Sequence, residues 1–247
     1  SGELDNGWTV STTYSMTNAA FSTSQVTIDM GDQGTVGLWN NASGAGINKY
    51  QDMMPTAGEQ VWDDSDTDDN GIVGHENENM LGYNGSFGGI GLSLAYVNGG
   101  AGGKDGGASD SSWVVTYDGL MDGLSLGVGQ GENGTTSDLS TAYAKYTAGS
   151  ITVGYQFSEI QNAQGTANEE SRHLAASIAV NENLSVSAGR FEVDMGAGTV
   201  DEESTGFSAS YTMGSSTIGF VANSTENVAG TAESDDSYRE ISVSFAF

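Results

Sequence analysis

The last ten residues of the chain alternate between large apolar side chains and polar or small ones. Residues 238–247 read YREISVSFAF, with Ile241, Val243, Phe245 and Phe247 on one parity. Glu240, Ser242, Ser244 and Ala246 occupy the other parity. A period of two residues is that of an extended strand with one apolar face and one wet or small face. The pattern therefore predicts a β-strand that runs to the last residue.

The same alternation recurs along most of the chain and predicts 14 strands. Three of them precede a long break from 40 to 78, which lacks a two-residue period: Leu4–Met16, Gln25–Met30 and Thr35–Trp39. The other 11 follow the break: Asn79–Phe87, Gly89–Asn98, Ser109–Asp118, Gly123–Gln130, Asp138–Thr147, Ile151–Glu159, Arg172–Val180, Leu184–Asp194, Thr205–Met213, Ser216–Thr225 and Tyr238–Phe247. A break of this length inside a compact domain indicates a functional loop.

The connections between the predicted strands alternate in length. Short joins stand at Gly88, Gly119–Asp122, Ala148–Ser150, Asn181–Asn183 and Gly214–Ser215, and long polar ones at Gly99–Ala108, Gly131–Ser137, Ile160–Ser171, Met195–Ser204 and Glu226–Asp236. Short turns on one rim and long loops on the other are typical of a transmembrane barrel, as are aromatic residues near strand ends. The pattern predicts an all-β, antiparallel transmembrane barrel formed by a single domain, 1–247. A soluble β-sandwich, with its aromatics in a core, is the alternative fold.

Composition agrees with a membrane barrel. No apolar run approaches the roughly 18 residues of a membrane-spanning helix, which leaves the barrel as the one membrane fold. The hydrophobic content is 36% and the mean hydropathy is -0.30, as expected when half of each strand faces water. The single proline suits a sheet whose interior N–H groups all pair.

The charge of the chain is strongly negative. There are 33 acidic residues against 6 Lys and Arg, which gives a net charge of -27. Binding to nucleic acid or to anionic head groups requires a basic face, so the charge excludes nucleic acid as a partner and argues against docking on anionic lipid head groups. The charge favours small cations instead.

The order of the strands and two of the segments resemble a known family. The closing strand with its terminal Phe247 resembles the last strand of bacterial outer-membrane barrels, and Met80–Tyr96 (MLGYNGSFGGIGLSLAY) is similar to the hairpin after the third loop of general trimeric Gram-negative porins. The resemblance implies a 16-stranded barrel in the outer membrane of a Gram-negative bacterium. It also implies a homotrimer in contact with outer-membrane lipid, passive diffusion of small hydrophilic solutes, and a constriction loop at 40–78 that folds into the pore. That loop follows the fifth strand in the family and the third one here, so we expect two N-terminal strands, about 40 to 50 residues with their loop, to be missing from this chain.

The long break is rich in carboxylates. Asp52, Glu59, Asp63, Asp64, Asp66, Asp68, Asp69, Glu76 and Glu78 lie within it, and Lys49 and His75 are its only cationic candidates. One interpretation is a solvated acidic surface loop. The strand order favours the other, an acidic pore constriction formed by Asp52, Glu59, Asp63, Asp64, Glu76 and Glu78.

Within the break, Asp66–Val73 (DTDDNGIV) matches the first eight positions of an EF-hand-type calcium loop. Asp66, Asp68, Asn70 and the carbonyl of Ile72 are the candidate Ca²⁺ ligands. The twelfth position is Asn77 and not the usual glutamate, although Glu76 and Glu78 flank it. A merely acidic, Gly-containing turn is the other interpretation, and no cofactor besides Ca²⁺ is expected.

The sequence gives little support to enzymatic chemistry. It holds two histidines and no cysteine, and no serine has a recognisable base beside it, so we expect neither a catalytic triad nor a zinc site. Two functions remain: a passive, cation-preferring porin, and a calcium-stabilised acidic β-rich surface or adhesion protein. A porin has polar residues on the inward face of its strands, whereas a sandwich is dry inside. The porin is favoured by the small or polar residues on one parity of a predicted strand: Thr152, Gly154, Gln156 and Ser158.

Overall fold

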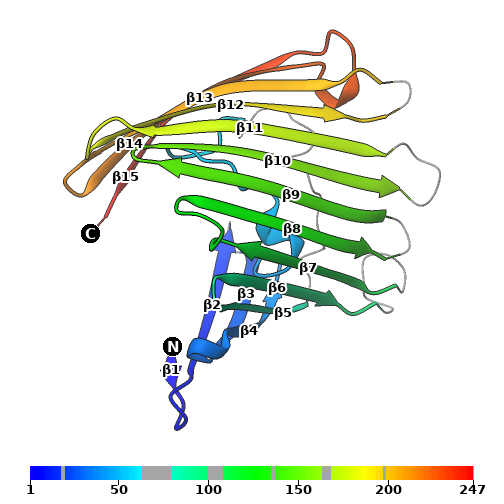
Figure 1. The fold of residues 1–247 in the computed structure, drawn as a ribbon, viewed down its shortest axis with the longest axis vertical. Helices are drawn as coiled ribbons and strands as arrows, with labels where there is room; N and C mark the ends of the chain where they lie inside the picture. Colours follow the sequence, from blue (N-terminus) through cyan, green and yellow to red (C-terminus); the bar gives the residue numbers. More distant parts are fainter. Residues whose placement is uncertain are drawn as a thin grey trace.

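The chain forms one antiparallel sheet in which every strand pairs with its neighbours in sequence. The computed structural model describes residues 1–17, 20–62, 79–99, 108–134, 137–162, 168–196 and 199–246. The strands are β1 (Gly2–Glu3), β2 (Thr9–Thr17), β3 (Ala20–Asp29), β4 (Thr35–Asn40), β5 (Met80–Phe87), β6 (Ile90–Val97), β7 (Asp110–Tyr117), β8 (Leu124–Asn133), β9 (Ser137–Ala148), β10 (Ile151–Asn162), β11 (Glu169–Ala179), β12 (Leu184–Asp194), β13 (Glu202–Met213), β14 (Ser216–Glu226) and β15 (Asp236–Phe245) (Figure 1). Three short 3-10 turns accompany them: η1 (Gly31–Gln33), η2 (Ile47–Tyr50) and η3 (Val228–Gly230).

All 14 predicted strands are confirmed as β2 to β15, with shifted ends. The predicted start at Leu4 is wrong because the chain turns there: the N–H of Leu4 donates to the carbonyl of Trp8 over 2.7 Å, and β2 begins at Thr9. The two-residue β1, whose Gly2 pairs with Val10, is too short to show a period. β8 and β10 each run three residues beyond their predicted ends at Gln130 and Glu159, because both strands stay paired with β9 after the regular alternation stops.

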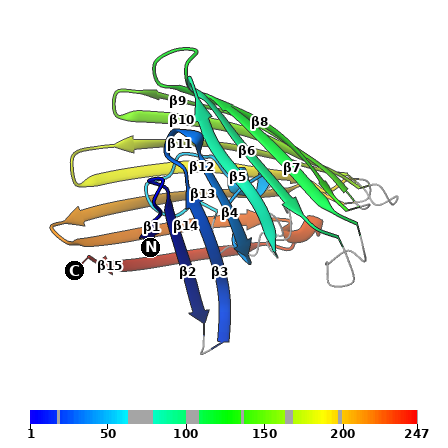
Figure 2. The same ribbon diagram turned by 90° about the horizontal axis from the view of Figure 1, so that it is seen from below.

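The sheet curves strongly, and residues 41–62 lie on its concave side (Figures 1 and 2). The strand order begins with β1 and ends with β15, and no ladder joins these two edges within the described residues. The short turns gather at one end of the strands and the longer connections at the other (Figure 1). No helix in the described part of the chain is long and apolar enough to cross a membrane.

The two faces of the sheet differ sharply in polarity. On β10, Ile151, Val153 and Tyr155 are 44–46% exposed, whereas Gln156 and Ser158 on the opposite parity are fully buried. We call the face that contacts residues 41–62 the inner face and the opposite one the outer face. Large apolar side chains exposed along the outer face are what a lipid-facing wall requires. They are not what a sandwich offers, since its apolar faces pack against a second sheet.

Hydrophobic packing on the inner face gathers where residues 41–62 touch the wall. Each of three buried clusters contains residues of this segment: Ala45 in the first, Ile47 in the second, and Met54, Val61 and Trp62 in the third. The wall supplies the rest of each cluster, for example Trp39 and Met80 to the first. The segment is therefore part of the packed structure.

Candidate functional site

The segment from 41 to 62 crosses the inner face and is attached first by two wall serines. The N–H of Gly46 donates to Ser93 Oγ on β6 over 2.8 Å, and the N–H of Ile47 donates to Ser112 Oγ on β7 over 3.0 Å. Gly46 has a φ of +67°, and a Cβ added there would lie 2.4 Å from the Cβ of Ala95. Only glycine allows this close approach of the backbone to the wall.

A single glutamine of β10 holds the middle of the segment. The fully buried Gln156 accepts a hydrogen bond from the N–H of Met53 through Oε1 at 2.8 Å. Its Nε2 lies 2.9 Å from the carbonyl oxygen of Tyr50 and 3.1 Å from that of Gln51. One side chain thus satisfies three backbone groups that have no strand partner, which buried backbone requires.

Further along, the segment lies directly on β12 and β13. The N–H of Ala57 donates to Ser187 Oγ over 3.0 Å, and Ser187 Oγ lies 2.6 Å from Ser208 Oγ. A Cβ on Gly206 would lie 1.8 Å from the carbonyl oxygen of Val61. Glycine at this wall position is required because the segment's backbone occupies the space of a side chain.

The last described residues of the segment end in an aromatic stack. Trp62 is fully buried, with its ring centroid 5.2 Å from that of His173 and 5.9 Å from that of Phe191. The rings of His173 and Phe191 are 4.4 Å apart and nearly parallel. Within the described residues, neither nitrogen of His173 has a hydrogen-bond partner. His173 lies within β11 and shares the parity of Ser171 and Ala175, which is the signal in the sequence of an inner position.

Two of the predicted constriction carboxylates fall in this segment. Asp52 is bound within it, because Oδ1 accepts the N–H of Met54 at 2.8 Å and Oδ2 accepts Nε1–H of Trp62 at 3.0 Å. Glu59 lines a depression against β13 to β15 together with Ser210, Ser242 and Ser244. Glu59 therefore lies against the wall, whereas Asp52 stabilises the fold of the segment.

The remaining predicted site residues lie outside the described residues. These are the constriction candidates Asp63, Asp64, Glu76 and Glu78 and the calcium candidates Asp66, Asp68, Asn70 and Ile72. In the described part of the chain, no group of three or more acidic or histidine side chains is arranged to hold a metal ion. The constriction and the calcium loop therefore stay predictions.

Charges are distributed unequally between the two faces. The register places Arg172, Arg190 and Arg239 on the outer face. Arg172 binds Glu170 over 2.8 Å and Glu192 over 3.2 Å, and Arg190 binds Glu192 over 3.0 Å and Glu203 over 2.5 Å. On the inner side, the described cations are Lys49 and Lys145. They are outnumbered by the acidic residues there, among them Asp29, Asp52, Glu59, Asp110, Asp118, Glu169, Glu202, Asp236 and Glu240.

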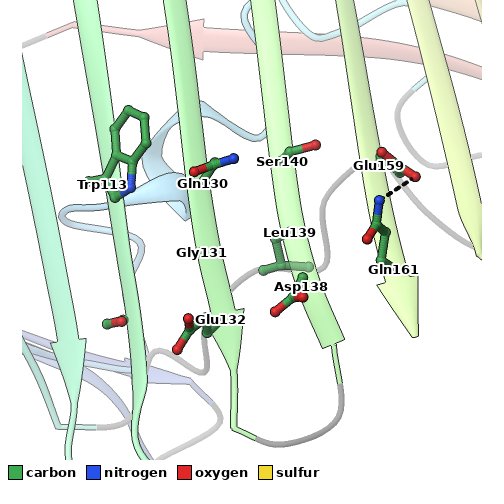
Figure 3. A pocket seen from close by; sticks show the side chains of 10 residues that line it. Trp113, Gln130, Gly131, Glu132, Asp138, Leu139, Ser140, Glu159 and Gln161 are labelled. Carbon is green, nitrogen blue, oxygen red and sulfur yellow. Dashed lines mark hydrogen bonds between the residues drawn. The ribbon is translucent and has the colours of Figure 1, made fainter. Parts of the chain in front are cut away.

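The outer face carries a depression of its own near the long-loop ends of β7 to β10, with a volume of about 590 Å³. Trp113, Gln130, Ser140 and Glu159 follow one another across these strands (Figure 3). Glu132 and Asp138 lie beyond them, and Gln161 donates to Glu159 over 2.9 Å. This polar rim marks where the apolar outer band ends.

Several solved structures are similar in fold to the chain, the following three among them. The anion-selective porin from Comamonas acidovorans matches with a TM-score of 0.66 and 17% identity over 93% of this chain and 80% of that one. A mutant of the Rh. blastica porin matches with a TM-score of 0.68 and 15% identity over 100% and 87%. OmpT, an outer membrane protein of Vibrio cholerae, matches with a TM-score of 0.54 and 13% identity over 90% and 77%. Identities this low show the fold alone, and no curated protein matches the chain in sequence.

An antiparallel sheet with an exposed apolar outer face and a polar inner face defines a membrane-spanning, porin-type protein. The profile of the Gram-negative porin family matches residues 1–247, so the chain belongs to that family. It is a diffusion channel of the Gram-negative outer membrane and not an enzyme.

Proposed function

We propose that the chain forms a closed transmembrane barrel that conducts small hydrophilic solutes, prefers cations, and is narrowed by the loop 40–78. The observation that carries the proposal is the excess of carboxylates on the inner side, where only Lys49 and Lys145 oppose them among the described residues. The three arginines, which could reverse the sign of the pore, lie on the outer face, where Arg172 and Arg190 bind outer-face acids.

Carboxylates inside a narrow aqueous passage act on permeating ions at a few Å. This is well inside the Debye length of about 8 Å at physiological salt, so they are screened less than charges on the exterior. They raise the local concentration of cations and repel anions. The preference for cations should therefore weaken as salt rises.

The test is the reversal potential of the channel in a planar bilayer under a KCl gradient. We expect the sign of a cation-preferring channel, and a clear decrease in selectivity when Asp52, Glu59, Asp63 and Asp64 are replaced by Asn or Gln. The matched control is the pair Glu132→Gln and Asp138→Asn, because these acids lie on the outer face. A reversal potential of anionic sign, or one that the four inner substitutions leave unmoved, would overturn the proposal.

We also propose a homotrimer embedded in outer-membrane lipid. The outer face of β2 to β4 exposes large apolar side chains, with Tyr14 67%, Met16 71% and Leu38 55% exposed, and these require lipid or another protomer as cover. Chemical cross-linking in mild detergent should yield a band of three protomers. A single protomer at every detergent concentration would contradict the trimer.

A further inference from the structure

The inner wall holds a second depression, of about 380 Å³, at the short-turn end of β5 to β7. Its polar lining consists of Lys49, Tyr50, Asn84, Ser86, Thr116 and Asp118. Asn84 and Thr116 are on the inner parity of their strands, and Asp118 follows two residues after Thr116. The segment supplies Lys49 and Tyr50 through η2, so the depression lies between the segment and the wall.

The ammonium group of Lys49 is positioned but has unused donors. Its Nζ donates to Asn84 Oδ1 over 3.2 Å, and Asn84 is itself fixed because its Nδ2 donates to the carbonyl of Gly44 over 2.9 Å. A lysine ammonium carries three N–H donors. In the described part of the chain this ammonium group, which lines the depression, has a single acceptor and no ion pair, which leaves two donors available to a ligand. Desolvation by burial lowers the pKa of Lys49 from its ordinary value.

Asp118 brings the opposite charge to the same depression. Its backbone N–H donates to the carbonyl of Gly89, but no described group pairs with its carboxylate. Tyr50 also lines the depression, and its ring is stacked on that of Tyr143 with the centroids 6.4 Å apart. Burial, and secondly the charge of Asp118, raise the pKa of Tyr50, so its hydroxyl stays a hydrogen-bond donor. The depression therefore offers one cation, one anion and one phenol, none of them ion-paired within the described residues.

A solute with a single charge meets one attractive and one repulsive group here. Lys49 repels a cation and Asp118 repels an anion, whereas a solute that carries both charges satisfies both groups. The volume is at the lower end of the range of small-molecule pockets, about 300–1,000 Å³. The arrangement thus selects small solutes with a permanent internal dipole.

We propose that this depression is a binding site for small zwitterionic solutes, with the carboxylate of an amino acid on Lys49 and its ammonium group on Asp118. The site lies on the permeation path, so the inference rests on the proposed channel function and names a solute class for it. A solute held there occupies part of the passage and lowers the ionic current while it is bound.

The experiment measures K⁺ current through single channels in a planar bilayer while L-alanine is added. We expect a saturable decrease in current for the wild type. Propionate and ethylamine, which each carry one of the two charges, should block at least tenfold more weakly. Lys49→Met and Asp118→Asn should each weaken the block by alanine about tenfold. The double variant Lys49→Asp with Asp118→Lys exchanges the two charges. It should restore part of the block, because the zwitterion can bind in the reverse orientation.

Two control variants change like charges that do not line the depression. Lys145→Met removes the other described lysine of the inner side, and Asp122→Asn removes an acid of the same short turn as Asp118. Both should leave the block by alanine unchanged. Binding of alanine to the protein in detergent, followed by saturation-transfer NMR, repeats the comparison without conduction, so a variant that fails to insert is still tested.

The outcomes separate this site from the channel function. A wild type that conducts with a cationic reversal potential but shows no saturable block by alanine overturns the site and leaves the channel proposal intact. Block that Lys49→Met and Asp118→Asn leave unchanged overturns it as well. An anionic reversal potential together with block that depends on both residues overturns the cation preference alone.

Discussion

The two ends of the segment 41–62 are held to the same wall by different sets of contacts. Near its start, backbone N–H groups of Gly46 and Ile47 donate to serine hydroxyls. At its end, Val61 and Trp62 are buried against Phe191 and His173. A single hydrogen bond contributes about 1 kcal/mol net, whereas burying a large aromatic side chain contributes several. Ala45 and Ile47 near the start are also fully buried, but their side chains are smaller than that of Trp62, so we expect the aromatic end to supply the larger share of the energy of attachment.

The largest expected effect comes from removing the aromatic end with Trp62→Ala. Trp62 is fully buried, and truncating a buried Trp typically costs about 3–5 kcal/mol. Its loss also frees Asp52 Oδ2 from its Trp62 donor. We expect a lower free energy of unfolding in urea and a larger, noisier single-channel current, because the segment leaves the wall.

Trp113→Ala is the matched control for this prediction. Trp113 is a tryptophan of the wall itself, on β7. Its side chain lies on the outer face, opposite to the segment, and is 39% exposed. It should leave the current noise unchanged. Equal noise in the two variants would show that the stack does not hold the segment.

Gln156→Ala removes the side chain that holds the middle of the segment to β10. The substitution leaves the N–H of Met53 and the carbonyls of Tyr50 and Gln51 without their side-chain partner, and each buried unsatisfied group costs about 1–3 kcal/mol. We expect a loss of about 2–4 kcal/mol in the free energy of unfolding, since water will reach some of these groups. Thr152 lies on the same strand and face, but among the described residues its hydroxyl bonds only to that of Thr147, so Thr152→Ala should cost less than about 1 kcal/mol. A loss for Gln156→Ala no larger than that of Thr152→Ala would contradict the role of Gln156.

The histidine of the stack allows the aromatic contribution to be separated from the polar one. His173→Phe keeps a ring between Trp62 and Phe191 but removes two nitrogens that lack partners among the described residues. Because an unpaired buried polar group is costly, we expect this variant to be stabilised by about 1 kcal/mol. His173→Leu, without the ring, should be destabilised relative to His173→Phe. A destabilised His173→Phe would show that the imidazole nitrogens make a contact that stabilises the wall.

The strands were predictable from the sequence because a two-residue alternation is a local property. The anchors of the segment were not. Ser93, Ser112 and Gln156 are ordinary polar residues on a wet strand face, and nothing local distinguishes Gln156, which binds the segment, from Thr152, which does not. Their role depends on contacts between residues more than forty positions apart, which no local pattern encodes. Asp52 was predicted as a constriction carboxylate, and its bond to Trp62 was not foreseen because it depends on how the loop folds.

The smallest expected effect belongs to the serine end. Ser112→Ala removes the acceptor of the Ile47 N–H, and we expect a loss of about 1 kcal/mol in the free energy of unfolding. The neighbouring Ser111→Ala is the matched control, because Ser111 lines the outer depression and should change stability by less than about 0.5 kcal/mol.

The two ends can also be compared by combining Ser112→Ala with Trp62→Ala. If the stack holds the segment and the serine only sets its position, the serine's contribution should vanish once Trp62 is gone, so the losses will not add. Fully additive losses would mean that the two attachments act independently, and that the serine end keeps its place on the wall without the aromatic one.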